Sequence, residues 1–127
     1  MTIEQNVELP LIYQSKSKVE RKEKVESALK KVDLWDRRTH TPNQVSGGQQ
    51  QRAAIPRAIV TEPTLILADE PTGNLDTKTG HRILEIFDEL NADGRTIVLI
   101  THDKETAGKT NRQISIIDGK MTEGILW

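Results

Sequence analysis

Two adjacent carboxylates, Asp69 and Glu70, stand at the end of a short apolar run in the middle of the chain. The run Leu65–Ala68 is continuous and is soon followed by Pro71, which predicts a strand buried on both faces, as in a parallel sheet. Open α/β sheets bind ligands at the carboxyl ends of their strands. One carboxylate there could hold Mg²⁺ and its neighbour a water molecule, which suits phosphoryl transfer. The pair alone leaves open the alternative of a strand ending in a solvated acidic turn.

A second candidate site is the segment Ser46-Gly47-Gly48-Gln49. Ser46 is a favourable helix N-cap, and the two glycines allow the backbone to approach a ligand closely. A helix that begins here would present free N–H groups and the positive end of its dipole, which together bind anions. The alternative is an ordinary capped helix. The polar run Gln49–Arg52 and the acidic strand that soon follows favour the anion site.

Two further residues, Asp76 and His102, complete the set. Asp76 can cap a helix that runs to about Asn91, after which residues 96–100 form a second apolar strand. A strand, a helix and a strand in this order form a βαβ unit. The unit brings His102 to the same sheet edge as Glu70. A lone histidine after a strand is more often structural or solvated, but this shared edge favours a functional one.

Together these segments resemble the ATPase subunits of ABC transporters over essentially the whole chain. The matching motifs, in the family's order and spacing, are the signature sequence Ser46–Gln49, the Walker B strand Leu65–Glu70, the D-loop around Asn74–Asp76 and the switch histidine His102. The branch that the chain resembles most is the lipoprotein-releasing and macrolide-exporting one, because of Asn6–Leu11, the tripled glutamine and Thr72–Asp76.

The resemblance implies ATP and Mg²⁺ as cofactors and a role for each candidate residue. It assigns Asp69 to Mg²⁺, Glu70 to polarising the attacking water, and His102 to steadying the γ-phosphate. Asp76 communicates across a head-to-tail dimer with a second ATPase subunit. The residues that bind the ATP held by that second subunit are Ser46, Gly47, Gly48 and Gln49. The resemblance also implies an integral-membrane transporter subunit as a partner.

Composition limits the other classes of function. Lysine plus arginine number 18 against 19 aspartates plus glutamates, a formal net charge of −1, which argues against a nucleic-acid partner. Related ATPases of DNA repair and chromosome structure are disfavoured further because long heptad arms are missing. There is no cysteine, and no apolar run approaches the length needed to cross a bilayer. We therefore expect a cytoplasmic protein, peripheral to the inner face of the cell membrane through a membrane partner.

The predicted fold class is α/β: a partial P-loop NTPase-like fold, mainly a parallel sheet with flanking helices plus part of a helical subdomain. Residues 1–60 are expected to form the helical subdomain that ends in the signature helix. Residues 61–127 are expected to form the C-terminal part of the ATPase core. An amphipathic helix is predicted over Val19–Val32, and Asp118-Gly119 predicts the turn of a hairpin that returns over Met121–Trp127.

Two prolines disturb the expected helices. Pro10 predicts that the first helix breaks near Leu9. Pro56 lies well inside the signature helix Gln49–Val60, where the family usually has a small residue such as alanine. It removes one N–H bond and crowds the carbonyl of Arg52, at a cost of roughly 3 kcal/mol if the helix stays straight.

The printed sequence contains no G-x-x-x-x-G-K-S/T motif, the loop that cradles phosphates. The glutamine loop and the adenine-contacting strands of the family would precede Met1. We therefore expect the C-terminal portion of an ABC transporter ATPase domain, truncated at its N-terminus, which would couple ATP hydrolysis to transport or extraction of substrate at the membrane. By itself the chain is expected to be inactive. Two alternatives remain: a non-catalytic partner that supplies its signature face to an intact subunit, and a non-functional remnant.

Overall fold

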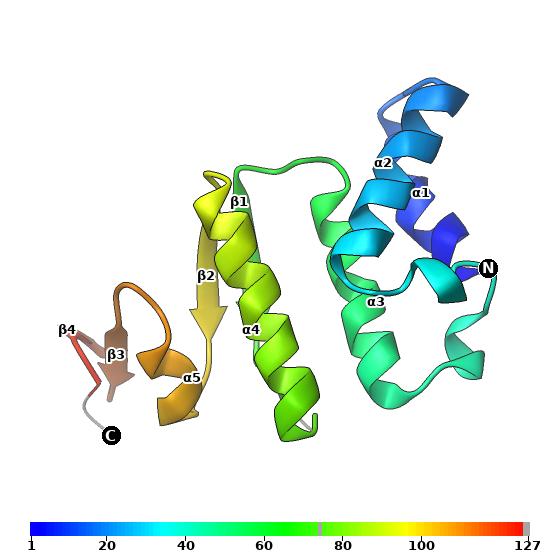
Figure 1. Ribbon diagram of the computed structural model, residues 1–127. Helices are drawn as coiled ribbons and strands as arrows, with labels where there is room; N and C mark the ends of the chain where they lie inside the picture. The colour runs from blue at the N-terminus through cyan, green and yellow to red at the C-terminus, as the bar shows by residue number, and fades with distance from the viewer. Residues whose placement is uncertain (74, 126–127) are drawn as a thin grey trace.

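Three helices precede a region of strands and helices (Figure 1). The computed structural model describes residues 1–73 and 75–125. Two short 3-10 turns, Trp35–Arg37 and Pro42–Gln44, lie between α2 and α3. The elements are α1 Ile3–Tyr13, α2 Lys18–Lys31, α3 Gly47–Ile59, β1 Leu65–Asp69, α4 Thr77–Ala92, β2 Thr96–Ile100, α5 Lys104–Gly108, β3 Ile114–Ile117 and β4 Lys120–Glu123.

The helices α1, α2 and α3 pack against one another. Ser17 caps α2, since its hydroxyl accepts a hydrogen bond from the Glu20 N–H at 3.2 Å. The amphipathic helix predicted for this region is confirmed. Its charged residues are exposed or half-buried, and Val25, Ala28 and Leu29 are buried, whereas Val19 in its first turn is 70% exposed.

The predicted break of the first helix near Leu9 is wrong, because α1 continues through Pro10 to Tyr13. Ile3, Val7 and Leu11 recur on one face of α1 and are at most 1% exposed. Burial of each of these side chains stabilises the fold by about 1.5–3 kcal/mol. The three together exceed the roughly 3 kcal/mol that an internal proline costs the helix. Tertiary packing therefore overrides the local preference.

The helix α3 also continues through a proline. Pro56 lies inside Gly47–Ile59 and its ring is less than 2% exposed. The prediction that Pro56 falls within the signature helix is confirmed, and the structure adds that the ring fills space in the core.

The strands β1 and β2 are parallel, with Leu65 opposite Thr96 and Asp69 opposite Ile100. The helix α4 connects them, as expected for a βαβ unit, and contacts β2 (Figure 1). The prediction that the first strand is buried on both faces is wrong. Its residues alternate: Ile66 and Ala68 are buried, whereas Leu65 and Leu67 are 52% and 69% exposed.

The second face of this strand pair is exposed. The sequence of a strand does not specify which other segments pack against its two faces, so this exposure could not be predicted from the apolar run. Val98 and Ile100 of β2 lie on the same face as Leu67 and are 42% and 55% exposed. A continuous apolar run predicts the hydrophobicity of both faces of a strand but does not determine which of them is covered.

The antiparallel pair β3 and β4 follows α5 at the far end of the molecule (Figure 1). Its turn is Asp118-Gly119, where φ is 49° and 77°, the left-handed pair required by the tightest hairpin turn. The predicted hairpin is thus confirmed. The return strand ends at Glu123, and the last part of the predicted segment, Leu126 and Trp127, lies outside the described residues.

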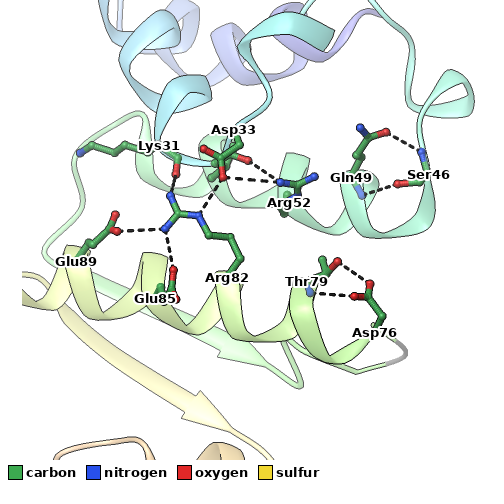
Figure 2. Close-up of polar contacts among 11 residues, drawn as sticks. Lys31, Asp33, Ser46, Gln49, Arg52, Asp76, Thr79, Arg82, Glu85 and Glu89 are labelled. Atoms are coloured by element: carbon green, nitrogen blue, oxygen red, sulfur yellow. Dashed lines mark hydrogen bonds and ion pairs between the residues drawn. The ribbon is translucent and has the colours of Figure 1, made fainter.

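Arg82 of α4 connects the helices of residues 1–60 to the strand region (Figure 2). Its guanidinium donates to the Asp33 carboxylate at 2.9 Å and to the Lys31 carbonyl at the end of α2 at 3.1 Å. The hydrogen bond to Asp33 is the main cause that raises the pKa of Arg82, and Glu89 adds to it. Buried apolar residues from both regions also form one cluster. The division into 1–60 and 61–127 stays a prediction.

Among the described residues, no helix combines the length and the apolar character that a membrane crossing requires.

Candidate functional site

Glu70, Thr101 and His102 meet where β1 and β2 end, and we call these three residues the strand-end cluster. The Glu70 N–H donates to the Ile100 carbonyl at 2.8 Å, which extends the strand pairing by one step. Its carboxylate accepts hydrogen bonds from the His102 N–H at 2.9 Å and from the Thr101 hydroxyl at 3.2 Å. The His102 Nδ1 lies 2.6 Å from Glu70 Oε1. The prediction that Glu70 and His102 emerge at one sheet edge is confirmed.

The strand-end cluster favours an ionised Glu70. The hydrogen bond from the His102 ring is the largest cause that lowers the pKa of Glu70, and partial burial opposes it. The short Nδ1 contact with a carboxylate requires the proton of the neutral ring to lie on Nδ1. The His102 side chain is 91% exposed, against 35% for Glu70, so the pair borders solvent. An ionised carboxylate at such an edge can accept a proton from water.

The backbone of Glu70 is held in an unusual conformation. Its φ is 45°, in the left-handed region, which a residue with a side chain rarely occupies. The Glu70 carbonyl accepts from the Gly73 N–H at 3.0 Å, and a Cβ at Gly73 would lie only 3.2 Å from that oxygen. Gln51 of α3 donates from its side-chain amide to the Pro71 carbonyl at 3.0 Å. The turn after β1 is therefore fixed from two sides.

Asp69 is the last residue of β1 and is exposed beside the strand-end cluster. It lies at the carboxyl end of the strand, where a cation would reach it. Within residues 1–73 and 75–125, no three histidine, cysteine, aspartate or glutamate side chains are grouped to hold a metal ion. Asp69 as a metal ligand stays a prediction.

The second site, the helix-start cluster, consists of Ser46, Gly47, Gly48 and Gln49 with Asp76 and Thr79. Ser46 and Gln49 form a reciprocal cap at the start of α3 (Figure 2). The Gln49 N–H donates to the Ser46 hydroxyl at 3.2 Å, and the Ser46 N–H donates to the Gln49 side-chain oxygen at 3.0 Å. The predicted N-cap is confirmed.

The two glycines of this cluster differ. A Cβ at Gly47 would meet nothing within 4 Å, so this part of the backbone is open to an approaching ligand. A Cβ at Gly48 would lie 3.2 Å from the Thr79 methyl group. Gly48 therefore allows the start of α3 to lie close to Thr79 near the start of α4, a reason for glycine that the sequence did not reveal.

Asp76 caps α4, as predicted (Figure 2). Its carboxylate accepts from the Thr79 N–H at 3.1 Å and from the Thr79 hydroxyl at 2.6 Å. The hydroxyl bond is the main reason that the pKa of Asp76 is lowered. Thr79 thus contacts the cap of α4 and the start of α3. Asn74, the first residue of the predicted D-loop, lies outside the described residues.

Sequence reasoning missed three residues that hold these sites together: Thr101, Thr79 and Gln51. Thr79 could have been found, because it stands three residues after the N-cap Asp76, where a hydroxyl can return a hydrogen bond to the cap. Thr101 and Gln51 bond to residues that lie 31 and 20 positions away, and no sequence pattern marks such bonds.

The family model described as ABC transporter matches residues 1–73, more than half of the chain. The chain belongs to the ABC transporter family. Among its relatives, the uncharacterised ABC transporter ATP-binding protein YknY of Bacillus subtilis (strain 168) is 57% identical over 121 residues, which cover 95% of this chain and 53% of that protein. The macrolide export ATP-binding/permease protein MacB of Rhodopseudomonas palustris (strain BisB18) is 47% identical over 90% of this chain and 17% of that protein.

Solved ABC transporter structures confirm the predicted fold class. The dimeric post-hydrolysis state of the ATP-binding cassette MJ0796 bound to ADP and Pi superposes with a TM-score of 0.84 at 43% identity, over 97% of this chain and 56% of that one. A second dimeric structure of MJ0796, described as a bacterial ABC transporter cassette, gives 0.84 at 42% identity, with the same shares of both chains covered. This chain therefore has part of the α/β fold of an ABC ATPase cassette and spans about half the length of the ATP-binding relatives it matches.

Proposed function

We propose that this chain is the C-terminal portion of an ABC transporter ATPase domain, which couples ATP binding and hydrolysis to transport or extraction of a substrate at the membrane. One observation carries the proposal: the Glu70 carboxylate accepts hydrogen bonds from Thr101 and His102 at the carboxyl end of β1. Membership of the family supplies the reaction class.

The strand-end cluster acts on the attacking water. Glu70 accepts the proton of that water, and the two hydrogen-bond donors beside it keep its carboxylate oriented. His102 steadies the transferred phosphoryl group, while Asp69 binds the metal. When bound, ATP with Mg²⁺ supplies the γ-phosphoryl group and the positive charge that offsets the developing negative charge.

The helix-start cluster serves a neighbouring subunit. The open backbone at Gly47 and the capped start of α3 face the ATP held by a second ATPase subunit in a head-to-tail dimer, with Ser46, Gly48 and Gln49 in contact and Asp76 at the dimer interface. Support comes from the dimeric MJ0796 cassettes. The name of MacB, an ATP-binding/permease protein, supports a membrane partner, through which this chain lies at the cytoplasmic face of the membrane. Residues 1–60 form the helical subdomain and residues 61–127 the core.

The test supplies the other half of a cassette. The chain is fused to the N-terminal half of the 57% identical YknY protein, and phosphate release from Mg-ATP is measured. We expect Glu70→Gln to keep ATP binding and to lower turnover by roughly 10²-fold or more, the scale of general-base catalysis. Glu23→Gln, on the exposed face of α2, is the matched control. Near-normal turnover in Glu70→Gln would remove Glu70 from the catalytic residues.

A second candidate function is a non-catalytic partner that offers its helix-start cluster to an intact subunit, and the capped start of α3 with open backbone at Gly47 favours it. The 127-residue chain by itself should then neither hydrolyse ATP nor bind it tightly, because most affinity in this class comes from the phosphate-cradling loop and Mg²⁺. Calorimetric titration with Mg-ATP and phosphate release over hours test this. Binding to intact YknY only when ATP is present would support the partner, and no binding under either condition would support a non-functional remnant.

A further inference from the structure

We propose that Gln51 is a positioning residue for Glu70. Its side-chain amide holds the Pro71 carbonyl and thereby fixes the turn from which the Glu70 carboxylate projects. Gln51 acts through this turn and does not touch the reacting groups. The inference rests on the proposed function, because it gives Gln51 a part in the reaction assigned to Glu70.

The contact joins two elements that are distant in the sequence. Gln51 lies in the second turn of α3, and its Nε2 donates to the Pro71 oxygen at 3.0 Å across 20 positions of sequence. Pro71 is buried and Gln51 is half-buried, so water competes little for this bond. A partly buried amide that reaches another element's backbone fixes the distance between the two elements.

Glu70 needs such support because its backbone is strained. A left-handed residue with a side chain persists only where its surroundings fix it. Pro71 has no N–H, so the peptide bond after Glu70 cannot contribute a donor to the turn. The turn is instead fixed by its carbonyls: that of Glu70 accepts from the Gly73 N–H at 3.0 Å, and that of Pro71 accepts from Gln51. Without Gln51, only the first of these two bonds remains.

The start of the same helix contributes four residues of the helix-start cluster, Ser46 as its N-cap and Gly47–Gln49 in its first turn. In the proposed dimer, Ser46 lies against the nucleotide of the other subunit, and Gln51 follows in the next turn of α3. Gln51 therefore fixes the position of Glu70 relative to the residues that bind that nucleotide.

The first experiment uses the 127-residue chain itself and measures amide hydrogen exchange. The reporters are the N–H groups of Gly73 and His102, which donate to the Glu70 carbonyl and carboxylate. We expect Gln51→Met to speed exchange at both amides about tenfold and Gln51→Lys, which keeps a donor, to restore slow exchange. Gln51→Glu, which keeps the shape but not the donor, should match Gln51→Met and serves if the methionine variant does not fold.

The matched control is Gln50→Met. Gln50 is in the same helix and also donates its amide to backbone, but to the carbonyls of Pro42 and Val45 at 2.9 and 3.4 Å. It should leave exchange at Gly73 and His102 unchanged. Equal exchange in Gln51→Met and wild type, or equal acceleration in Gln50→Met, would overturn the proposal.

The second experiment measures turnover in the fusion with the YknY half. Gln51→Met should lower kcat about tenfold and leave KM for ATP within about twofold, since only the placement of Glu70 changes. Gln51→Lys should recover most of the rate. If Gln51→Met lowered the urea midpoint but did not lower kcat selectively over KM, the role of Gln51 would be merely structural. If the unsubstituted fusion does not hydrolyse ATP, the proposed function fails, and the exchange experiment still decides whether Gln51 holds Glu70.

Discussion

The strand-end cluster and the helix-start cluster are built in opposite ways. In the first, Glu70 is held by residues 31 and 32 positions later in the sequence, and the contacts exist only because β1 and β2 pair in one register. In the second, the bonds within each cap join residues three positions apart.

Because of this difference, we expect the helix-start cluster to contribute to stability and the strand-end cluster mainly to the chemical step. A local cap forms with its helix and stabilises it directly. A cluster at paired strand ends adds little to the stability of the strands, but it assembles a hydrogen-bonded carboxylate and imidazole that neither strand could bring together alone. Changes to the strand-end cluster should therefore affect turnover, and changes to the helix-start caps should affect folding as well.

The largest expected effect comes from His102→Ala. In the fusion with the YknY half, turnover should fall roughly 10²-fold, the scale of losing one charge-stabilising donor in an active site. The denaturant midpoint should fall only slightly, since the His102 side chain is 91% exposed and its bond to Glu70 borders solvent. His81→Ala is the control, because His81 is an exposed histidine of α4 that pairs with Glu105 at 3.6 Å, away from the strand ends. If His102→Ala clearly lowered the denaturant midpoint but left turnover unchanged, the strand-end cluster would serve stability and not chemistry.

Pro56→Ala tests the helix that carries the second cluster. Removing the proline gains roughly 3 kcal/mol of helix stability, but Ala loses two buried methylene groups, worth about 1.6 kcal/mol. We therefore expect a net stabilisation of about 1.5 kcal/mol, seen as a higher urea midpoint at unchanged slope. An unchanged midpoint would mean that the buried ring contributes as much as the missing N–H costs.

Ser46→Ala should destabilise the chain by about 1 kcal/mol, because the alanine leaves the Gln49 N–H without its capping oxygen. The measurement is the urea midpoint. Ser27→Ala, at an exposed position within α2, is the control and should change the free energy of unfolding by less than about 0.5 kcal/mol. Equal midpoints for Ser46→Ala and wild type would show that the cap contributes nothing to stability.

The smallest effect is the pH dependence of the strand-end cluster. The hydrogen bond from His102 lowers the pKa of Glu70 in the folded chain. The ionised carboxylate therefore stabilises the fold above the ordinary glutamate pKa of about 4.3, and this contribution is lost as the pH falls through the lower folded pKa. The midpoint difference between wild type and Glu70→Gln should shrink between pH 6 and about pH 3. Asp76, whose pKa is also lowered, is present in both proteins, so its contribution cancels in the difference.

Several elements could be predicted because their signals are local. The cap of α4 at Asp76, the hairpin turn at Asp118-Gly119 and the start of α3 at Ser46 each depend on a few consecutive residues. The order of strand, helix and strand was also sufficient to place Glu70 and His102 at one edge, since parallel strands end on the same side of a sheet.

The sequence alone determined which residues can do chemistry and which helices and strands carry them. Tertiary structure decided the rest, because the decisive contacts join distant segments. It kept α1 straight through Pro10, since buried neighbours offset the local cost of the proline. It left one face of β1 exposed, gave Gly48 a packing partner in Thr79, and brought Gln51 to the turn after Glu70. Periodicity and capping describe a chain one segment at a time, whereas these contacts depend on how the segments pack.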